Sequence, residues 1–285
     1  MKEIEIYSPA KINLFLNISG FNEKKKLHTL TAYNQTIDMY DIITIYERKK
    51  IYNGIQIICD DNIPLDSSNS AYIAANLFFK YTGINPNSFF IKIKKGIPVG
   101  YGLGGESTDA ASVLVGLNEY YYTNLSNNEL LFLASKVGSD VPYFINGGYA
   151  KVSDTGNEVT QLKECYYNNF IVIMPNFSLS TKDMYRKLDE FAFIKKEYLN
   201  NTLYNDFVKV MPQELIKLRE FLNKYDNINH SLTGSGSAYY IASHELFHNP
   251  LIINDIKKNF PDFKIRNYKK VKSRKLIKIS KNLFI

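Results

Sequence analysis

The stretch Pro98-Val-Gly100-Tyr-Gly102-Leu-Gly104-Gly105-Glu-Ser107-Thr-Asp109-Ala-Ala decides how the rest of the chain is interpreted. Four of the six residues from 100 to 105 are glycines, which can adopt positive φ and let the backbone approach a ligand closely. The stretch follows an expected strand, Phe89–Lys94, and leads into an expected helix, Thr108–Tyr121. The unpaired amide groups and the dipole at the start of such a helix favour an anion. The sequence therefore predicts a phosphate-binding loop, to which Ser107 adds a hydroxyl group.

Three other kinds of phosphate loop do not fit this stretch. A Walker A loop ends in Gly-Lys-Ser/Thr, whereas this one ends in Gly-Glu-Ser. The spacing Gly100-x-Gly102-x-x-Gly105 also matches the dinucleotide fingerprint, with Glu119 at a suitable distance. Glu119 falls inside the expected helix, however, and the preceding elements do not alternate as βαβ units, so we interpret that match as accidental. No His-Arg-Asp or Asp-Phe-Gly of a protein kinase follows. Taken alone, the loop could also be a turn that only packs helix on strand.

The pattern of apolar residues along the chain predicts an α+β fold in two domains, divided near residue 155. Helical spacing and end signals predict further helices at Asn69–Tyr81, Glu129–Val137, from Thr181 onward and at Gln213–Lys224. Alternation and β-branched residues predict strands at Ile4–Tyr7, Asn13–Ile18, Asp41–Glu47, Ile55–Cys59, Phe170–Met174, Tyr239–Ala242 and Lys264–Tyr268. Strands dominate the first part and alternate with helices in the second.

The composition excludes several classes of protein. No apolar run approaches the roughly 20 residues that span a bilayer, and the first residues do not resemble a signal peptide. Cys59 and Cys165 are the two cysteines, so a disulfide framework or a zinc site is not expected and the cytosol is the expected compartment.

The net charge of +7 comes from one end of the chain. Residues 251–285 hold 11 basic and 2 acidic residues, against 24 basic and 26 acidic residues in the rest. This segment is either an electrostatic footprint for nucleic acid or a solvated edge of the fold, and we favour the second interpretation because its Lys-Ile-Arg-Asn-Tyr pattern alternates.

Three motifs, in order along almost the whole chain, resemble those of the GHMP kinases. Pro98-x-x-x-Gly102-Leu-Gly104-Gly105-x-Ser107 resembles their ATP loop, Ser8-Pro-Ala-Lys11-Ile-Asn13-Leu their first motif, and Leu232-Thr-Gly234-Ser235-Gly-Ser-Ala238 their third. The resemblance implies an ATP-binding GHMP domain at residues 1–155, similar to domain 2 of ribosomal protein S5. It also implies a C-terminal GHMP domain at 156–285 with a ferredoxin-like α/β sandwich.

Further segments narrow the resemblance within that family. His28-Thr-Leu, an expected turn at Asp38–Asp41 and Gly138-Ser-Asp140-Val-Pro-Tyr-Phe144 are similar to those of members that act on a cytidine diphosphate-linked polyol in the non-mevalonate isoprenoid route. The resemblance implies transfer of the γ-phosphate of ATP to the 2-hydroxyl of that substrate, with Lys11 and Asp140 as the catalytic pair. The chemistry is consistent, because a carboxylate can accept the hydroxyl proton while an ammonium group stabilises the phosphoryl charge.

The resemblance also implies the binding residues. The expected contacts to ATP, used with Mg²⁺, are Pro98, Gly100, Gly102, Leu103, Gly104, Gly105 and Ser107, with Asn69 and Lys95 near the adenine end. The expected contacts to substrate are Asn13, His28, Thr181, Tyr185, Gly234 and Ser235. His28 would hydrogen-bond cytosine and Tyr185 would stack on it. No protein ligand for the metal is predicted.

Two departures and several alternatives stay open. The family usually has Gly-Tyr-His where this chain has Lys26-Leu27-His28, and a glycine where this chain has Glu106. The alternatives are another GHMP kinase, such as a homoserine or mevalonate kinase, a GHMP-like protein without activity, and a basic nucleic-acid-binding protein. A membrane or nucleic-acid partner is not expected, and a homodimer is left open.

Overall fold

The computed structural model describes residues 2–48, 54–86, 88–199, 202–245, 250–273 and 275–281. Its core feature is a long antiparallel hairpin of β1 (Lys2–Asn22) and β2 (Leu27–Arg48). The two separate strands predicted at Ile4–Tyr7 and Asn13–Ile18 are one strand, and the turn predicted at Asp38–Asp41 is wrong because β2 runs through it. Irregularities after Pro9, Asn13 and Ile18 shift the register of the hairpin. Such bulges bend a strand without ending it, which is why the hydrophobic alternation breaks while the strand continues.

The first sheet is built on this hairpin. Among the described strands it has eight, with the path β12-β1-β2-β4-β3, where β3 is Gly54–Cys59, β4 is Ser88–Lys94 and β12 is Lys275–Lys281. At the other end of the hairpin, β5 (Tyr149–Ser153) pairs with β2 and with β6 (Glu158–Gln161), and the short β8 (Tyr204–Asn205) pairs with β1.

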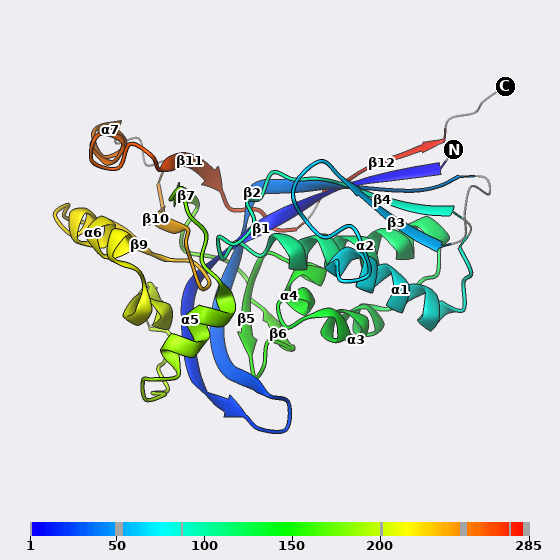
Figure 1. Cartoon of the computed structure of the whole chain (residues 1–285), viewed down its shortest axis with the longest axis horizontal. Coiled ribbons are helices and arrows are strands. Elements are labelled where there is room, and N and C mark those ends of the chain that lie inside the picture. The colour runs from blue at the N-terminus through cyan, green and yellow to red at the C-terminus, as the bar shows by residue number, and fades with distance from the viewer. Residues whose placement is uncertain are drawn as a thin grey trace.

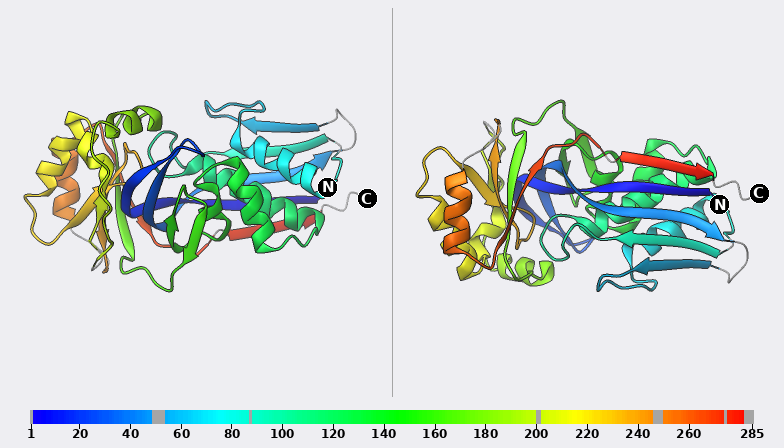
Figure 2. Two further views of the ribbon diagram at one scale, coloured as in Figure 1. Left: turned by 90° about the horizontal axis from the view of Figure 1, so that it is seen from below. Right: turned by 90° about the horizontal axis from the view of Figure 1, so that it is seen from above.

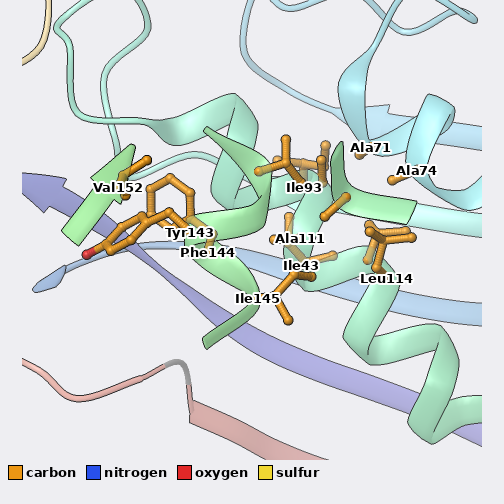
Figure 3. Packing of buried hydrophobic residues seen from close by; sticks show 14 of the residues in the cluster. Ile43, Ala71, Ala74, Ile93, Ala111, Leu114, Tyr143, Phe144, Ile145 and Val152 are labelled. Atoms are coloured by element: carbon orange, nitrogen blue, oxygen red, sulfur yellow. The ribbon is translucent and has the colours of Figure 1, made fainter. Parts of the chain in front are cut away.

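Helices cover one face of this sheet (Figure 1). They are α1 (Ser70–Thr82), α2 (Gly105–Tyr121), α3 (Asn127–Val137) and α4 (Val141–Asn146). The helices predicted at Asn69–Tyr81 and Glu129–Val137 are confirmed as α1 and α3, with ends that differ by one or two residues. A capping box of Ser126 and Glu129 begins α3. Figure 3 shows part of the shared core, in which strand and helix side chains interdigitate: Ile43, Ala71, Ala74, Ile93, Ala111, Leu114, Tyr143, Phe144, Ile145 and Val152.

The second sheet confirms the predicted ferredoxin-like arrangement. Its described strands have the order β11-β7-β10-β9, all antiparallel, where β7 is Asn169–Met174, β9 is Asn229–Leu232, β10 is Tyr239–Ser243 and β11 is Lys264–Lys269. Between them lie α5 (Thr181–Leu188), the 3₁₀ helix η1 (Asp206–Val210), α6 (Gln213–Leu222) and α7 (Pro250–Asn259). The succession β-α-β-β-α-β in this strand order is that of the ferredoxin-like fold.

The second sheet has two buried faces. Ile171 and Ile173 belong to the cluster that includes α6 and α7, whereas Val172 and Met174 pack with Ile12 and other residues of the hairpin. The alternation of side chains along β7 produces this division. Figure 2 shows the result, with α6 and α7 on the outer side of the second sheet and the first two strands on its inner side. The middle of β1 is therefore enclosed between the two halves of the molecule.

The basic C-terminal segment joins the two sheets. After α7, the chain forms β11 at the edge of the second sheet and then β12, which pairs with residues 2–7 of β1 at the edge of the first sheet (Figure 2). We keep the division of the chain near residue 155 as a proposal, noting that β6 and β12 beyond it pair within the first sheet.

In the part of the chain that the structure describes, no helix has both the length and the apolar character needed to cross a membrane.

Candidate active site

The predicted phosphate loop ends in the N-terminus of α2. Gly104 is the N-cap residue with φ of 77°, and the helix begins at Gly105, three residues earlier than the sequence pattern indicated. A Cβ atom on Gly104 would lie 2.6 Å from the ring of Phe144 and 3.1 Å from Cγ of Lys11. Only glycine fits this position, and its backbone therefore stands directly beside Lys11 at the open end of the helix.

A cavity of about 370 Å³ opens over this loop. It is lined by segments from both halves of the molecule: the middle of β1, the phosphate loop, the start of α4, the start of α5 and the third motif. The predicted site residues that line it are Lys11, Asn13, Lys95, Pro98, Gly100, Gly102, Leu103, Gly104, Gly105, Ser107, Asp140, Thr181, Tyr185, Gly234 and Ser235. His28 and Asn69 lie outside this cavity, each in a neighbouring one.

The phosphate loop and the third motif are interlocked. A Cβ atom on Gly102 would lie 2.2 Å from the carbonyl oxygen of Thr233, and one on Gly234 would lie 2.7 Å from the carbonyl oxygen of Gly102. The amide of Ala238 donates to the carbonyl of Tyr101 at 3.2 Å. Glycines in both loops thus allow direct backbone contact between segments more than a hundred residues apart.

Asn13 fixes this junction. Its Oδ1 accepts from the amide of Gly234 at 2.7 Å and from Nζ of Lys11, and its Nδ2 donates to Asn34 at 2.7 Å. Its own amide donates to the hydroxyl of Thr233 at 3.1 Å. The side chain is buried and fully hydrogen-bonded, so in this structure Asn13 positions the lysine and the third motif. Thr181 and Ser235 join across the cavity by a hydroxyl pair 2.9 Å apart.

Lys11 and Asp140 both line this cavity. Lys11 is 4% exposed, and burial lowers the pKa of its ammonium group, an effect that the nearby Asp140 carboxylate opposes. Asp140 precedes α4 and is half-buried, and its side chain makes no capping hydrogen bond to that helix. Its carboxylate therefore has no capping role. A desolvated ammonium group and a carboxylate at one cavity suit charge stabilisation and proton transfer.

Lys95 lies in a buried cluster that the sequence did not indicate. Its Nζ binds Asp41 of β2 and, at 3.0 Å, Asp109 of α2. The other oxygen of Asp41 accepts from the amides of Gly96 and Ile97 at 2.7 and 2.8 Å. Burial raises the pKa of Asp109 well above its usual range, with the charge of Asp41 adding to the effect. Asp41 and Asp109 both lie in segments discussed above, but the spacing of residues along the chain does not predict that their side chains meet Lys95 from other elements. The cluster anchors both ends of the phosphate loop.

Asn69 caps α1 rather than facing the main cavity. Its Oδ1 accepts from the amide of Ala71 at 2.8 Å, and its Nδ2 donates to the carbonyl of Pro64 at 2.7 Å. It lines a recess of about 30 Å³ together with Lys95, Glu106 and Asp109. Glu106 itself is exposed and lines both this recess and the main cavity. An adenine contact by Asn69 stays a prediction.

His28 and Tyr185 meet at a second cavity of about 410 Å³. The two rings are stacked with centroids 4.4 Å apart and planes at 23°. Tyr185 lines both cavities, so it marks the boundary between them. Leu27 is 45% exposed and lines the second cavity. Asp189, whose carboxylate lies 2.6 Å from Nε2 of His28, is not among the residues predicted from the sequence. A lone acidic residue after a helix carries no sequence pattern that would single it out.

Known proteins resemble this chain in both sequence and fold. The family model described as GHMP kinases N terminal domain matches residues 69–148. Two solved structures share the fold: a 4-(cytidine 5'-diphospho)-2C-methyl-D-erythritol kinase has a TM-score of 0.71 at 23% identity, covering 93% of this chain and 99% of that one. A homoserine kinase from Cytophaga hutchinsonii has a TM-score of 0.72 at 17% identity, covering 96% and 97%. At these identities the structures establish the fold alone.

Relatives that match in sequence define the family more closely than the solved structures do. A 4-diphosphocytidyl-2-C-methyl-D-erythritol kinase of Clostridium botulinum (strain Loch Maree / Type A3) is 43% identical over 180 residues, which are 63% of this chain; the chain spans 62% of that relative's length. The enzyme of the same name from Clostridium tetani is 35% identical over 256 residues, covering 83% of this chain and 90% of the relative. The chain therefore belongs to the family of the 4-diphosphocytidyl-2-C-methyl-D-erythritol kinases, within the GHMP kinases.

Proposed function

We propose that this protein transfers the γ-phosphoryl group of ATP to the 2-hydroxyl of 4-diphosphocytidyl-2-C-methyl-D-erythritol, a step of the non-mevalonate isoprenoid route. The observation that carries the proposal is that two neighbouring cavities share Tyr185 as a lining residue. One contains the phosphate loop with Lys11 and Asp140, and the other contains the ring of His28. A substrate with a reacting alcohol at one end and a base at the other matches this division.

The phosphate loop fits a nucleoside triphosphate. The N-terminus of the 17-residue helix α2 supplies amide groups that can bind an anion. The glycines before it let the loop pack directly against Thr233 and Phe144, where any Cβ would clash. Magnesium, brought on the phosphates of ATP, would neutralise part of their charge. Asp41 fixes the position of the residues just before the loop, because its carboxylate accepts hydrogen bonds from the amides of Gly96 and Ile97.

The proposed chemistry uses Lys11 and Asp140. The carboxylate of Asp140 accepts the proton of the substrate hydroxyl as its oxygen bonds to the γ-phosphorus, and the bond from that phosphorus to the β,γ-bridging oxygen breaks to release ADP. Lys11, held by Asn13, stabilises the negative charge on the transferring group. Its burial strengthens this interaction because the surrounding dielectric is low.

The alternative kinase substrates would use the cavity at the phosphate loop in the same way, and they differ from the cytidine substrate in what they could place in the cavity at His28. Homoserine and mevalonate are phosphorylated by proteins of the same fold, but neither substrate has a base that could use the rings at His28. A nucleic-acid-binding function, suggested by the basic segment, leaves the phosphate cavity without a role. A cytosolic location is part of the proposal, supported by the two free thiols of Cys59 and Cys165.

The test is ATP-dependent release of ADP by the purified protein with Mg²⁺, offering the cytidine substrate, homoserine and mevalonate in parallel. We expect turnover only with the cytidine substrate and a loss of at least about a hundredfold in kcat for Asp140→Asn, with ATP affinity nearly unchanged. Turnover with homoserine or mevalonate alone would replace the proposed substrate. Near-normal turnover of Asp140→Asn would remove Asp140 from the mechanism.

A further inference from the structure

One face of α5 holds the imidazole of His28 from two directions. Tyr185 and Asp189 are four residues apart and therefore lie one turn apart on the same side of the helix. The ring of Tyr185 stacks on the imidazole at 4.4 Å, and the carboxylate of Asp189 lies 2.6 Å from its Nε2. The amide of Asp189 donates to the carbonyl of Tyr185 at 2.9 Å, which keeps Asp189 next to the last turn. The stacking contact thus fixes the plane of the imidazole, and the contact with Asp189 fixes the direction in which Nε2 points within that plane.

The contact with Asp189 determines which ring nitrogen carries the proton. A neutral imidazole has one donor and one acceptor, and an ionised carboxylate can only accept. The short contact with Asp189 therefore requires the proton on Nε2, and Nδ1 is left as an acceptor. Within the described residues, Nδ1 of His28 has no hydrogen-bond partner. A ligand that pairs with it must present a donor.

The cavity around His28 has both apolar and charged walls. Phe21 lies edge-on to the imidazole, with centroids 5.1 Å apart and planes at 75°, and Leu27 lines the same cavity. Both side chains are more than 40% exposed and offer apolar surface. Charged side chains of Lys182, Asp183 and Arg186 also line the cavity. An unpaired acceptor with a fixed position is selective, because a mismatched ligand leaves that acceptor facing another acceptor.

We propose that Asp189 is a positioning residue that keeps His28 in its Nε2-protonated form, so that Nδ1 selects a pyrimidine with an exocyclic amino group over one with an oxo group at the same position. The inference rests on the proposed function, since it takes the base of the substrate to meet His28. Cytosine carries the amino group and uracil the oxo group. Without Asp189 the imidazole can exchange its proton between the two nitrogens and accept either base.

The protonation state is tested by NMR on the full chain. The chain has four histidines, so labelling with ¹⁵N-histidine gives few ring signals, and His28→Gln assigns the signal of His28. In alkaline buffer, we expect the Nε2-protonated pattern in the wild type and a mixture of the two neutral forms in Asp189→Ala. Glu190→Gln, which removes the adjacent exposed carboxylate, is the matched control and should match the wild type. A wild-type proton on Nδ1, or an unchanged pattern in Asp189→Ala, would overturn the inference.

The selectivity is tested by calorimetric binding of cytidine 5′-diphosphate and uridine 5′-diphosphate, which requires no turnover. We expect the wild type to prefer the cytidine compound by about tenfold or more, and Asp189→Ala to bind both within about twofold. Asp189→Glu should restore part of the preference because it returns a carboxylate. Equal wild-type affinities, with turnover of the cytidine substrate intact, would overturn this inference and leave the proposed function standing. Absence of that turnover would instead refute the proposed function.

Discussion

The ammonium group of Lys11 lies in the interior, where 4% of the residue is exposed and its nearest hydrogen-bond partner is the neutral amide of Asn13. An ammonium group is costly to bury, and a protein interior chosen for stability alone would place an apolar side chain there. Burial also lowers its pKa below the ordinary value of 10.5. At the scale of single residues, stability and the proposed chemistry therefore oppose each other at this position.

Replacing Lys11 by methionine separates the two effects. We expect Lys11→Met to lower kcat by about two to three orders of magnitude, because one stabiliser of the transferring phosphoryl charge is lost. The melting temperature should stay the same or rise at neutral pH. Because the folded-state pKa is lowered, the cost of the buried charge is present below that pKa and disappears as pH rises towards 10.5, so the gain in Tm should shrink at alkaline pH. Steady-state kinetics and a thermal melt at two pH values check this; a large fall in Tm at neutral pH would contradict it.

At the scale of elements, the cluster of Asp41, Lys95 and Asp109 connects β2, the end of β4 and α2 around the phosphate loop. Two carboxylates share one ammonium group, and the buried Oδ1 of Asp109 has no hydrogen-bond partner among the residues that the structure describes. The cluster thus holds one acidic group more than it can neutralise when both carboxylates are ionised.

Asp109→Asn should stabilise the protein at neutral and alkaline pH. The folded-state pKa of Asp109 is raised above its ordinary value of 3.8, so its contribution to stability is fully present below 3.8 and is lost as pH rises through the raised pKa. An asparagine of the same shape keeps an acceptor for Lys95 and has no charge to lose. Urea unfolding across pH should show a growing advantage for the variant. Lys95→Met is the opposite change: it leaves buried carboxylates unpaired and should cost about 3–5 kcal/mol. An advantage of Asp109→Asn that falls with pH would contradict this account.

The interlocked loops give a second element-scale prediction. Gly102→Ala forces positive φ on an alanine and places its Cβ 2.2 Å from the carbonyl oxygen of Thr233, so we expect a loss of roughly 2–4 kcal/mol and weaker ATP binding. Gly83→Ala, also at positive φ but with open space around the added atom, isolates the backbone term and should cost about 1 kcal/mol. Chemical denaturation of both variants gives the comparison. Equal losses would mean that the two loops can move apart.

These elements show what the sequence could and could not predict. The helix after the glycine loop and three strands of the second sheet, β7, β10 and β11, follow from local patterns, and the structure confirms them, with the helix beginning three residues early. The fourth strand, β9, was not predicted. The unbroken length of β1, the partners of Lys95 and the contact between His28 and Asp189 depend on segments brought together by the fold. Spacing along a chain carries no information on such contacts, and bulges hide a long strand by shifting its alternation.

At the scale of the whole molecule, the segment of residues 264–281 closes the outer edge of each sheet, through β11 in one and β12 in the other. Deleting residues 275–285 removes β12 and exposes the backbone of residues 2–7 of β1. We expect a lower Tm and concentration-dependent association, since an unpaired strand edge pairs with other chains. Deleting residues 282–285 alone is the control. Size-exclusion chromatography and thermal melts check the result, and a monomer with unchanged Tm would show that β12 contributes nothing.

The pairing of β12 with β1 also has a consequence for the order of events in folding. Lys2 pairs with Lys281, so the free edge of β1 is covered by a strand that is synthesised after all the other described strands. During translation, the edge of β1 stays open while the phosphate loop and the third motif are already available. Contacts so distant in sequence slow folding, because the intervening chain must first be ordered. Until β12 is made, the open edge of β1 is a place where partly synthesised chains can pair with one another.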